Sequence, residues 1–367
     1  MHKFIRIDMT TLTSNVSEVP EKYVGLGGRA LTSNFVNDEV VATCHPLGKN
    51  NKIVFAPGLL SGTAAANSGR MSVGAKSPLT GTIKESNTGG SSSQMLAKMG
   101  IKAFVIEGMP TEDKFYVIKL DVNGVTIDEA PEAILGGCGN YEAMGVLNEK
   151  YGNHIGIAII GPAGEYRLPS ANISFKDPDG NMRSAGRGGL GAVLGSKKVK
   201  AIVIDETGAG KVEIANPEAF MAANKVFSKA LLDHPVSGQG LALYGTDVLV
   251  NILNEAGGLP AYNFTGGRIK HNDNISGETM NATITERGGE GKVSHGCHKG
   301  CVIRCSQWYA DKDGKYITSG FEYETIWGLG ADAGIEDLDA IAYIDRAMDD
   351  VGVDSIETAV EIGRAHV

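Results

Sequence analysis

The stretch RSAGRGGLGAVLGSKKVKAI, residues 183–202, combines a glycine loop, a helix and the start of a strand in one short segment. Its closely spaced glycines predict a tight loop, because glycine adopts backbone conformations that other residues avoid. The apolar residues that follow predict a helix running toward Lys198, and Ala201–Ile204 reads as a β-strand. A glycine loop that opens a helix directs backbone N–H groups at the positive end of the helix dipole, which favours a bound phosphate or pyrophosphate.

Within this stretch, Gly186–Gly191 (GRGGLG) also fits the dinucleotide-binding pattern GxGxxG. Its context does not, because the segment DPDGNMRSA precedes it rather than a strand, and no acidic residue ends a second strand about 20 residues later. A nicotinamide-binding Rossmann domain is therefore not expected. A second loop, NTGGSSS (residues 87–93), repeats the arrangement, and Arg70, Lys76 and Arg183 lie near the two loops in sequence. Together they predict a ligand with several phosphates, although an ordinary capped helix is the simpler interpretation of either loop alone.

Composition narrows the class of protein. The chain has 367 residues, which predicts more than one domain, and a formal net charge of −9, which argues against binding nucleic acid. It has no apolar run near the roughly 18 residues of a membrane span, and its start lacks the pattern of a secretory signal. We expect a cytoplasmic protein without membrane or nucleic-acid partners. The 50 glycines lie in separate clusters, which indicates either a large cofactor held by main chain or a β-rich domain with many turns.

The residue pattern changes near Gly208–Gly210, where we place a domain boundary. Residues 1–208 read as short strands separated by turns, with few helices; the strands are expected at Phe4–Met9, Lys52–Ala56, Ala103–Glu107, Phe115–Leu120, Ile155–Ile160 and Ala201–Ile204. Residues 209–367 have helical periods, with helices expected from Pro217, capped by Asn216, to about Leu232, from about Thr246 to Gly257, over roughly Glu336–Val351, and from Asp354 onward. The predicted fold class is α+β, a β-rich domain followed by a mostly helical one.

The stretch GCHKGCVIRC, residues 296–305, holds three of the five cysteines, Cys297, Cys301 and Cys305. Clustered thiolates are soft ligands that suit an iron–sulfur cluster or zinc. A zinc site could be completed by His295 or His298. A four-iron cluster usually takes a fourth thiolate, for which Cys44, Cys138 or a cysteine beyond the end of this chain are candidates.

Carboxylates accompany aromatic residues in GFEYETIWGLGADAGIEDL, which begins at Gly320. A carboxylate held among apolar neighbours has a raised pKa and can exchange protons near neutral pH. Glu322 or Glu324 could do so, and acidic residues on a solvated helix face explain the same composition.

Several ordered blocks resemble the aldehyde ferredoxin oxidoreductase family, the tungsten–pterin enzymes of anaerobes. The blocks run over nearly the whole chain: GLGGRAL, FAPGLLSGT, SGRMSVGAKSPLTG, NTGG, IIGPAGE, RSAGRGGLGAVLGSKKVKAI, YGTDVLVNILNE, FEYETIWGLGA and DDVGVD. The resemblance implies oxidation of aldehydes to carboxylic acids with ferredoxin as electron acceptor. It also implies a β-rich first domain, residues 1–208, that binds two pterins around one tungsten or molybdenum, with magnesium bridging their phosphates.

The resemblance also assigns roles to individual residues. Arg70 matches a pterin-contacting arginine, and the main-chain carbonyls of Asn87 and Ser184 match positions near the magnesium. The cofactor-binding blocks further contain Gly89, Arg183 and Gly186, and the pterin motif DDVGVD contributes Asp349 and Asp354. Glu324 matches a glutamate beside the metal, where it could move a proton, and Cys297, Cys301 and Cys305 match the four-iron cluster site in the second domain, residues 209–367.

This sequence departs from the family pattern in two places. The family's cysteines are spaced by two residues and then three, so Cys301 and Cys305 align while Cys297 is displaced by one. Tyr343 and Arg346 replace a glutamate and a histidine that bind a mononuclear iron between subunits, so no bridging iron is expected. A homodimer is still one of the expected assemblies. A subunit of a larger tungsten or molybdenum reductase complex and a non-catalytic zinc-binding fragment are the alternatives.

The chain ends in EIGRAHV, residues 361–367, one back-translation of which, GAGATCGGAAGAGCACACGTC, reads like a sequencing-adapter junction. We expect the natural protein to be longer and the tail after about Ile362 to be foreign. The family's remaining cluster cysteine, a histidine at the metal and the second pterin aspartate belong to its C-terminal third, so this chain alone is expected to be inactive.

Overall fold

The computed structural model describes residues 2–366, which form two compact units. The first unit comprises the chain up to Ala215 together with the short segments His298–Gly300 and Asp349–Asp354. The second comprises Asn216–Cys297, Cys301–Met348 and the chain from Ser355.

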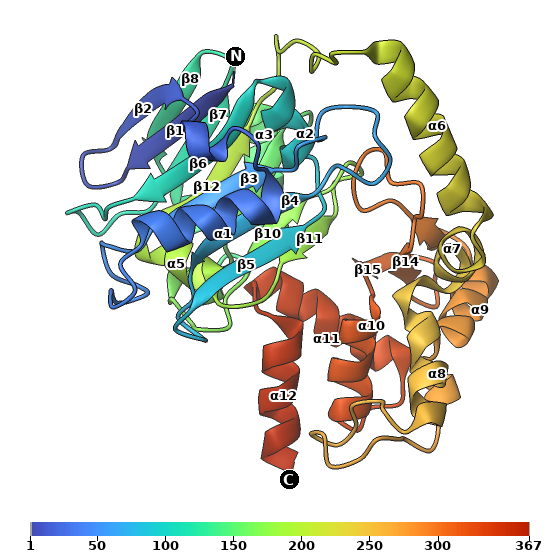
Figure 1. The fold of residues 1–367 in the computed structure, drawn as a ribbon. Helices are drawn as coiled ribbons and strands as arrows, with labels where there is room; N and C mark the ends of the chain where they lie inside the picture. The colour runs from blue at the N-terminus through green and yellow to red at the C-terminus, as the bar shows by residue number, and fades with distance from the viewer. Residues whose placement is uncertain (1, 367) are drawn as a thin grey trace. The chain divides into compact units, whose positions relative to one another are not determined.

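Two six-stranded sheets build the first unit (Figure 1). The first sheet has the order β2 (Thr13–Glu18), β1 (Lys3–Asp8), β6 (Ile101–Glu107), β3 (Ile53–Pro57), β4 (Met71–Lys76), β5 (Ile83–Thr88). The second has the order β11 (Met182–Ala185), β10 (Ile173–Lys176), β9 (Gly156–Ile159), β12 (Val199–Ile204), β7 (Tyr116–Asp121), β8 (Gly124–Glu129). The pairs β1–β6 and β12–β7 are parallel, and the other neighbours are antiparallel.

The two sheets share one apolar core. Phe55 of β3 stacks on Phe104 of β6 with ring centroids 4.6 Å apart, and both belong to the same buried cluster as Ile202 of β12. The short helices α2 (Ser92–Lys98) and α5 (Leu190–Ser196) contribute apolar side chains to this cluster. Successive strand residues point to opposite faces, so the alternate residues pack under α1 (Gly28–Glu39) on one sheet and α3 (Asn140–Tyr151) on the other.

All six strands expected from the sequence are present, each shifted by no more than two residues at either end. The expectation of few helices was wrong for α1 and α3. Both follow a glycine, Gly27 or Gly139, and neither has a side-chain N-cap, so the usual start signal of a helix is missing from their sequences. The remaining short helical segments of this unit are η1 (Glu21–Tyr23), η2 (Glu132–Ile134) and α4 (Pro162–Glu165).

The loop at Gly186 follows a strand, β11, contrary to the expectation that no strand precedes it. This strand forms an antiparallel hairpin with β10 at the edge of its sheet and is not a neighbour of β12, the strand that follows α5. The loop is therefore not part of a parallel β-α-β unit, and the structure is not that of a Rossmann domain.

The second unit joins helices to a three-stranded antiparallel sheet of β13 (Lys292–His295), β14 (Ser306–Ala310) and β15 (Tyr316–Ser319). Its α-helices are α6 (Pro217–Asp233), α7 (Leu241–Tyr244), α8 (Leu249–Ala256), α9 (Gly277–Arg287), α10 (Tyr323–Ile326), α11 (Leu338–Val351) and α12 (Ser355–His366). Single turns of other helix types are η3 (Pro235–Gly240), η4 (Gly245–Val248), η5 (Asn272–Ile275) and η6 (Trp327–Asp332). The predicted cap of α6 is confirmed, since the Asn216 side chain accepts from the Ala219 N–H at 3.0 Å. Together the units confirm the α+β class.

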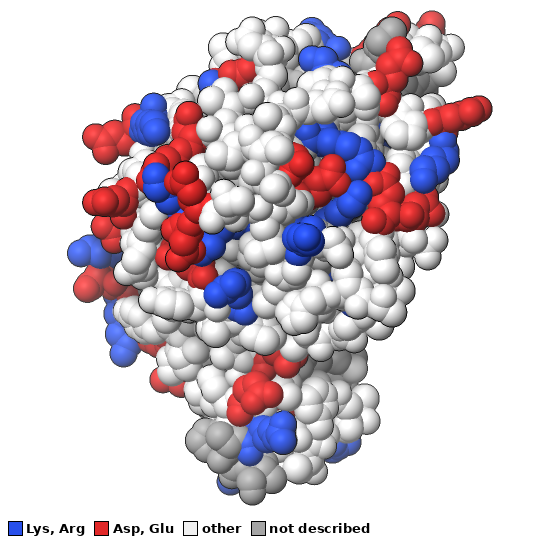
Figure 2. All heavy atoms as spheres, turned by 90° about the vertical axis from the view of Figure 1, so that its left-hand side faces the viewer, with Lys and Arg blue, Asp and Glu red and all other residues white. Residues whose placement is uncertain are grey.

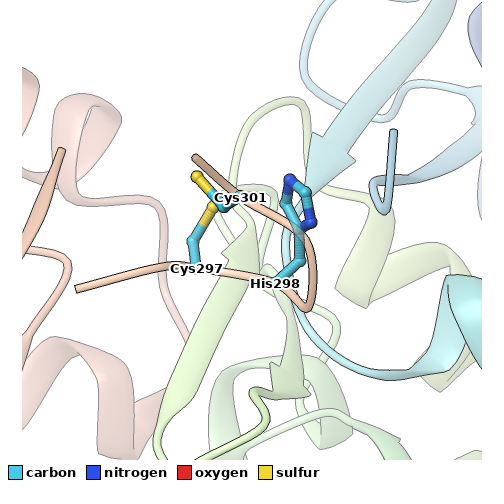
Figure 3. Close-up of side chains that lie close together, drawn as sticks. All are labelled: Cys297, His298 and Cys301. Atoms are coloured by element: carbon cyan, nitrogen blue, oxygen red, sulfur yellow. The ribbon is translucent and has the colours of Figure 1, made fainter. Parts of the chain in front are cut away.

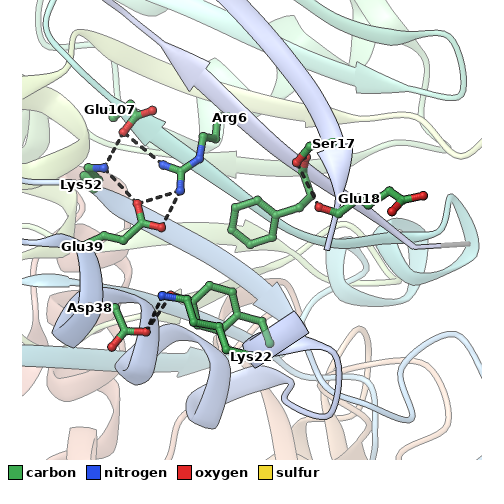
Figure 4. A network of polar contacts seen from close by, with 10 residues as sticks. Arg6, Ser17, Glu18, Lys22, Asp38, Glu39, Lys52 and Glu107 are labelled. Carbon is green, nitrogen blue, oxygen red and sulfur yellow. Dashed lines mark hydrogen bonds and ion pairs between the residues drawn. The ribbon is translucent and has the colours of Figure 1, made fainter. Parts of the chain in front are cut away.

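A network of four charged residues ties together three strands and α1 of the first unit (Figure 4). Glu39, at the end of α1, accepts from Arg6 at 2.5 and 2.7 Å and from Lys52 at 3.0 Å. Glu107 pairs with the same two cations at 3.4 and 2.9 Å. Burial alone would raise the pKa of Glu39, but hydrogen bonds from Arg6 and Lys52 lower it overall.

The surface carries charges of both signs. On the face in Figure 2, lysines and arginines are interspersed with aspartates and glutamates, with no single basic field. Among residues 2–366, no helix is long and apolar enough to cross a membrane.

Candidate cofactor and metal sites

The segments before β4 and at the end of β5 bring Arg70 and Asn87 together. Asn87 lies opposite Ser72 in the β4–β5 ladder, and its side-chain amide donates to the Ser72 hydroxyl at 3.1 Å. The Arg70 guanidinium donates to the Asn87 side-chain oxygen, and at 3.3 Å to the Asn87 main-chain oxygen. Lys76 points elsewhere, donating to the main-chain oxygens of Ala42 and, at 2.8 Å, Cys44. Arg70 and Lys76, which are close in sequence, thus contact different parts of the structure and do not form one phosphate-binding group.

The β10–β11 hairpin holds two more of the predicted cofactor residues. Arg183 is nearly buried and pairs with the buried Asp177 carboxylate at 3.4 Å. Ser184 lies opposite Ser174 in the ladder. The NTGG loop, which contains Gly89, packs against the end of β10, since a Cβ at Gly90 would lie 3.0 Å from the Lys176 carbonyl oxygen.

A buried polar network joins this hairpin to the distant segment 349–354. The Asn172 side-chain amide donates to the Val353 carbonyl at 2.9 Å and to the Ser184 hydroxyl at 3.4 Å, while its backbone N–H donates to the Gly352 carbonyl at 2.9 Å. Ser174 donates to the Asn172 side-chain oxygen at 3.2 Å. The Asn140 amide donates to Ser174 at 3.2 Å and to the Asp349 carbonyl at 2.9 Å. Ser184 and the pterin-motif segment are therefore held together by one set of hydrogen bonds.

Further contacts fix both ends of segment 349–354 within the first unit. The Tyr141 hydroxyl donates to the Asp349 carboxylate at 3.4 Å, and the Tyr141 N–H donates to Asp350 at 3.0 Å. The Asp354 N–H donates to the Ser170 carbonyl at 2.8 Å. The sequence analysis missed the roles of Asn140, Tyr141 and Asn172; an asparagine directly before a buried strand, as in SANIS (residues 170–174), was the available signal for Asn172.

The glycine loop that contains Gly186 packs closely on the backbone that carries Asn172. A Cβ at Gly191 would lie 2.0 Å from the Asn172 carbonyl oxygen, so any other residue there would displace this backbone. The loop is fixed on its other side by Ser77, whose hydroxyl donates to the Gly188 carbonyl at 2.7 Å. Gly191 thus serves close backbone packing in the predicted cofactor region.

The cysteine stretch forms the loop between β13 and β14. Ligand atoms of Cys297, His298 and Cys301 all lie within 4.8 Å of one another (Figure 3). Cys305, the residue before β14, and His295, at the end of β13, are not in this group. A hydrogen bond with Cys297 lowers the pKa of the Cys301 thiol to about 6, against the opposing effect of burial. This hydrogen bond favours the thiolate of Cys301, which is the form that binds metals.

Residues 298–300 of this loop belong to the first unit. The Asn67 N–H donates to the Gly300 carbonyl at 3.2 Å, and the Gln94 side chain donates to the Lys299 carbonyl at 3.2 Å. The His298 ring is so close to Gly69 that a Cβ there would lie 2.5 Å from its Nδ1. These contacts place the loop tip against the residues directly before Arg70.

Carboxylates gather around η4 and α10 in the second unit. The Thr246 hydroxyl donates to the Glu322 carboxylate at 3.0 Å and accepts from the Tyr323 N–H at 2.9 Å. Glu324 lies half-buried in α10. Burial and then the charge of Glu324 raise the pKa of Tyr323 to about 12. Asp247, which follows Thr246, is fully buried, and the sequence analysis did not consider it.

At the positions of the family's bridging-iron motif, the structure has a tyrosine and an engaged arginine. Tyr343 of α11 is exposed, and Arg346 donates to the Ile317 carbonyl of β15 at 3.0 Å. The structure therefore has no glutamate–histidine pair at these two positions.

Comparison with known proteins decides the family. The family profile described as "Aldehyde ferredoxin oxidoreductase, N-terminal domain" matches residues 4–206, and the profile described as "Aldehyde ferredoxin oxidoreductase, domains 2 & 3" matches residues 222–366. The chain belongs to the aldehyde ferredoxin oxidoreductase family. It is 37% identical over 366 residues to the tungsten-containing aldehyde ferredoxin oxidoreductases of Thermococcus kodakarensis and Pyrococcus furiosus, a match that covers 99% of this chain and 58% of each relative.

Two further comparisons of this aldehyde ferredoxin oxidoreductase family member have lower sequence identity. The WOR-like subunit of an aliphatic sulfonate oxidoreductase from Pyrococcus furiosus is 23% identical over 385 residues, covering 99% of this chain and 58% of that subunit. The solved active-site complex BamBC of benzoyl coenzyme A reductase superposes with a TM-score of 0.81 at 21% identity, covering 99% of this chain and 55% of that one. This last likeness supports the fold alone.

Proposed function

We propose that this chain is the N-terminal part of a cytoplasmic, tungsten-dependent enzyme that oxidises aldehydes to carboxylic acids and reduces ferredoxin. The observation that carries the proposal is the 37% identity to tungsten-containing aldehyde ferredoxin oxidoreductases over 99% of the chain. The chain spans 58% of the length of those relatives, so the activity is proposed for the whole protein.

The first unit offers a donor set that fits a phosphate-bearing pterin cofactor. Arg70 and Arg183 supply positive charge, and the main-chain oxygens of Asn87 and Ser184 are suitable ligands for magnesium. Gly89 and Gly186 lie in the two glycine loops. In segment 349–354, Asn140 and Asn172 donate to the carbonyls of Asp349 and Val353, and the Asp354 N–H donates to the Ser170 carbonyl. When bound, the metal–pterin group supplies the two-electron acceptor for the aldehyde.

Residues for proton transfer and electron transfer are proposed in the second unit and the cysteine loop. Glu324 is half-buried among carboxylates and is proposed to take up a proton during aldehyde oxidation. Cys297, Cys301 and Cys305 are proposed to bind the four-iron cluster, whose thiolate requirement the low pKa of Cys301 meets. The exposed Lys299 and Arg304 flank these cysteines and are proposed to attract an acidic ferredoxin.

The test is elemental analysis and an aldehyde assay on the full-length protein, purified without oxygen. The proposal predicts tungsten or molybdenum with about four irons per chain, and reduction of a viologen dye by an aldehyde. Protein that contains tungsten and iron yet reduces no dye with a panel of short and aromatic aldehydes would contradict the proposed substrate class.

Two observations favour alternative functions, which analysis of the same purified protein can distinguish. The similarity to the WOR-like subunit favours a subunit of a larger reductase complex, which co-purifying subunits would reveal. The close approach of Cys297, His298 and Cys301 favours a single bound ion such as zinc, and zinc without tungsten or iron would support that function instead.

A further inference from the structure

Asp247 is a buried carboxyl group without an ionic or hydrogen-bonding partner among the described side chains. It lies in η4, its exposed fraction is 0%, and neither carboxyl oxygen has a hydrogen-bond partner in the described structure. The N-terminus of α9 closes over its backbone, since a Cβ at Gly277 would lie 2.9 Å from the Asp247 carbonyl carbon. Burying an ionised carboxylate without a partner is very unfavourable, so the neutral acid is the form that fits this site.

No cation on the described elements around Asp247 is available to balance a negative charge on its carboxyl group. Thr246 binds Glu322 directly, and Glu322 and Glu324 are the charged side chains that act on Asp247. The elements packed against η4 are α7, α8, α9, α10 and β14. Arg287, the cation on these elements, is bound to both carboxylate oxygens of Asp339 at 2.6 and 2.9 Å. Their other titratable groups are acids or phenols: Tyr244, Glu255, Glu278, Glu286, Tyr309 and Tyr323.

The pKa of Asp247 also favours the neutral acid. Burial raises the pKa of Asp247 well above its usual value, and the negative charges of Glu322 and Glu324 raise it further, opposed by its own backbone N–H. When neighbouring carboxyl groups differ in this way, the more buried one keeps the proton and the more exposed one ionises.

We propose that Asp247 holds the proton of this acidic cluster as a neutral carboxylic acid, that it is coupled to Glu324 through the charge of that residue, and that it positions Glu324 to accept the next proton. The inference deepens the proposed function and rests on it for its catalytic meaning. Oxidation of an aldehyde with water as the oxygen source follows RCHO + H2O → RCOO⁻ + 3H⁺ + 2e⁻, in which a C–H bond breaks and a C–O bond forms. The metal cofactor, when bound, would supply the acceptor for the two electrons, and the protons leave through the protein. Asp247 is a positioning residue in this scheme, since it acts through Glu324.

Infrared spectroscopy of the wild-type holoenzyme tests the protonation directly, whether or not an aldehyde is oxidised. We expect a carboxylic-acid C=O band near neutral pH that shifts with ¹³C-aspartate labelling and is lost in Asp247→Asn. The Asp332→Asn variant is the matched control, because Asp332 is also buried in this unit and burial raises its pKa, but it accepts from the Phe264 N–H at 3.2 Å. The Asp247 band must persist in that control.

The Glu324→Gln variant tests whether the charge of Glu324 affects the protonation of Asp247. Removing the negative charge should lower the pH at which the Asp247 band disappears, and an unchanged midpoint would overturn the proposal. In the loaded enzyme we expect Asp247→Asn to lower kcat roughly tenfold and to remove one ionisation from the pH profile, with metal content unchanged. Wild-type turnover and profile in that variant would also overturn it.

The proposed function and this inference fail separately. If the wild-type enzyme oxidises no aldehyde, the proposed substrate class is wrong. If it nevertheless shows the Asp247 band, and the midpoint of this band shifts in Glu324→Gln, the inference about Asp247 still holds. If Asp247→Asn does not fold, the labelled wild type and Glu324→Gln still decide whether Asp247 is a neutral acid coupled to Glu324.

Discussion

At the scale of single residues, the neutral acid at Asp247 has a measurable effect on stability. In the unfolded chain an aspartate ionises near pH 3.9, whereas folded Asp247 retains its proton to a higher pH. As pH rises between these two values, the unfolded state loses a proton that the folded state keeps. The free energy of unfolding therefore falls with rising pH, by up to about 1.4 kcal/mol per pH unit.

The Asp247→Asn variant cannot lose this proton, so its stability relative to wild type should increase as pH rises above the unfolded value near 3.9. Urea unfolding at several pH values above that value measures the difference. Asp313→Asn is the control for the loss of one carboxylate, because Asp313 is exposed in the same unit. A constant difference for Asp247→Asn would mean that the folded protein ionises this group normally.

The cysteine loop permits a second test at the residue scale. Cys301→Ser should remove most of the cluster iron, because serine replaces the thiolate that the site already favours. Cys138→Ser is the comparison variant, since Cys138 is also a half-buried cysteine and is a candidate for the fourth cluster thiolate; full iron content in this variant excludes Cys138 from that role. Iron per chain and the electron paramagnetic resonance signal of the reduced protein are the measurements.

Separate Cys297→Ser and His298→Ala variants then distinguish the two kinds of metal site. Both ligand atoms lie in the close group with Cys301, which would suit one ion. If a four-iron cluster is bound through thiolates, only Cys297→Ser should lose iron, whereas loss of bound metal in both variants indicates a mononuclear site.

At the scale of structural elements, Asn172 connects the β10–β11 hairpin to segment 349–354. Asn172→Ala leaves the Val353 carbonyl and the Ser174 hydroxyl without one buried partner each, so we expect about 2 kcal/mol of destabilisation and reduced pterin content. Denaturant unfolding and pterin fluorescence of extracts measure the two effects. Asn34→Ala, at an exposed position on α1, should change neither.

The Glu39 network makes an independent prediction for the first sheet. Glu39→Gln should cost about 1 kcal/mol at pH 7, since the charges are half-buried and shared among four residues. Because the pKa of folded Glu39 is lowered, its stabilising effect is present above the unfolded pKa near 4.3 and is lost as pH falls through the folded value. The difference between variant and wild type should thus vanish in acid. A difference that persists below pH 3 would indicate packing rather than charge as its origin.

The same elements show what could be predicted from the sequence. Strands such as β12 were predicted because an uninterrupted run of β-branched and apolar residues is buried on both faces. The helix α6 was predicted from its Asn216–Pro217 start. The network around Asn140 could not be predicted, because Asn140 and Asp349 are 209 positions apart and one sequence contains no information on such pairs. Asp247 was not predicted although it lies in the block YGTDVLVNILNE, because its burial depends on how α9 and α10 pack against η4.

At the scale of the whole chain, the net charge of these residues opposes the proposed electron transfer to ferredoxin. The 367 residues carry a formal charge of −9, which repels an acidic ferredoxin at long range, so docking needs local attraction. Lys299 and Arg304 are exposed in the cysteine loop and can supply that attraction. We expect the Lys299→Gln/Arg304→Gln variant of the holoenzyme to reduce ferredoxin about three- to tenfold more slowly at low salt, with weaker dependence on ionic strength.

Two comparisons separate docking from general effects on the enzyme. Reduction of a small viologen dye should be unchanged in the double variant, because the dye needs no protein docking surface. A Lys312→Gln/Lys315→Gln variant removes two exposed charges from the β14–β15 turn, so it changes the net charge equally and should leave ferredoxin reduction near the wild-type rate. Equal slowing in both variants would show that net charge governs association, and unchanged salt dependence in the first would place ferredoxin docking on another part of the protein.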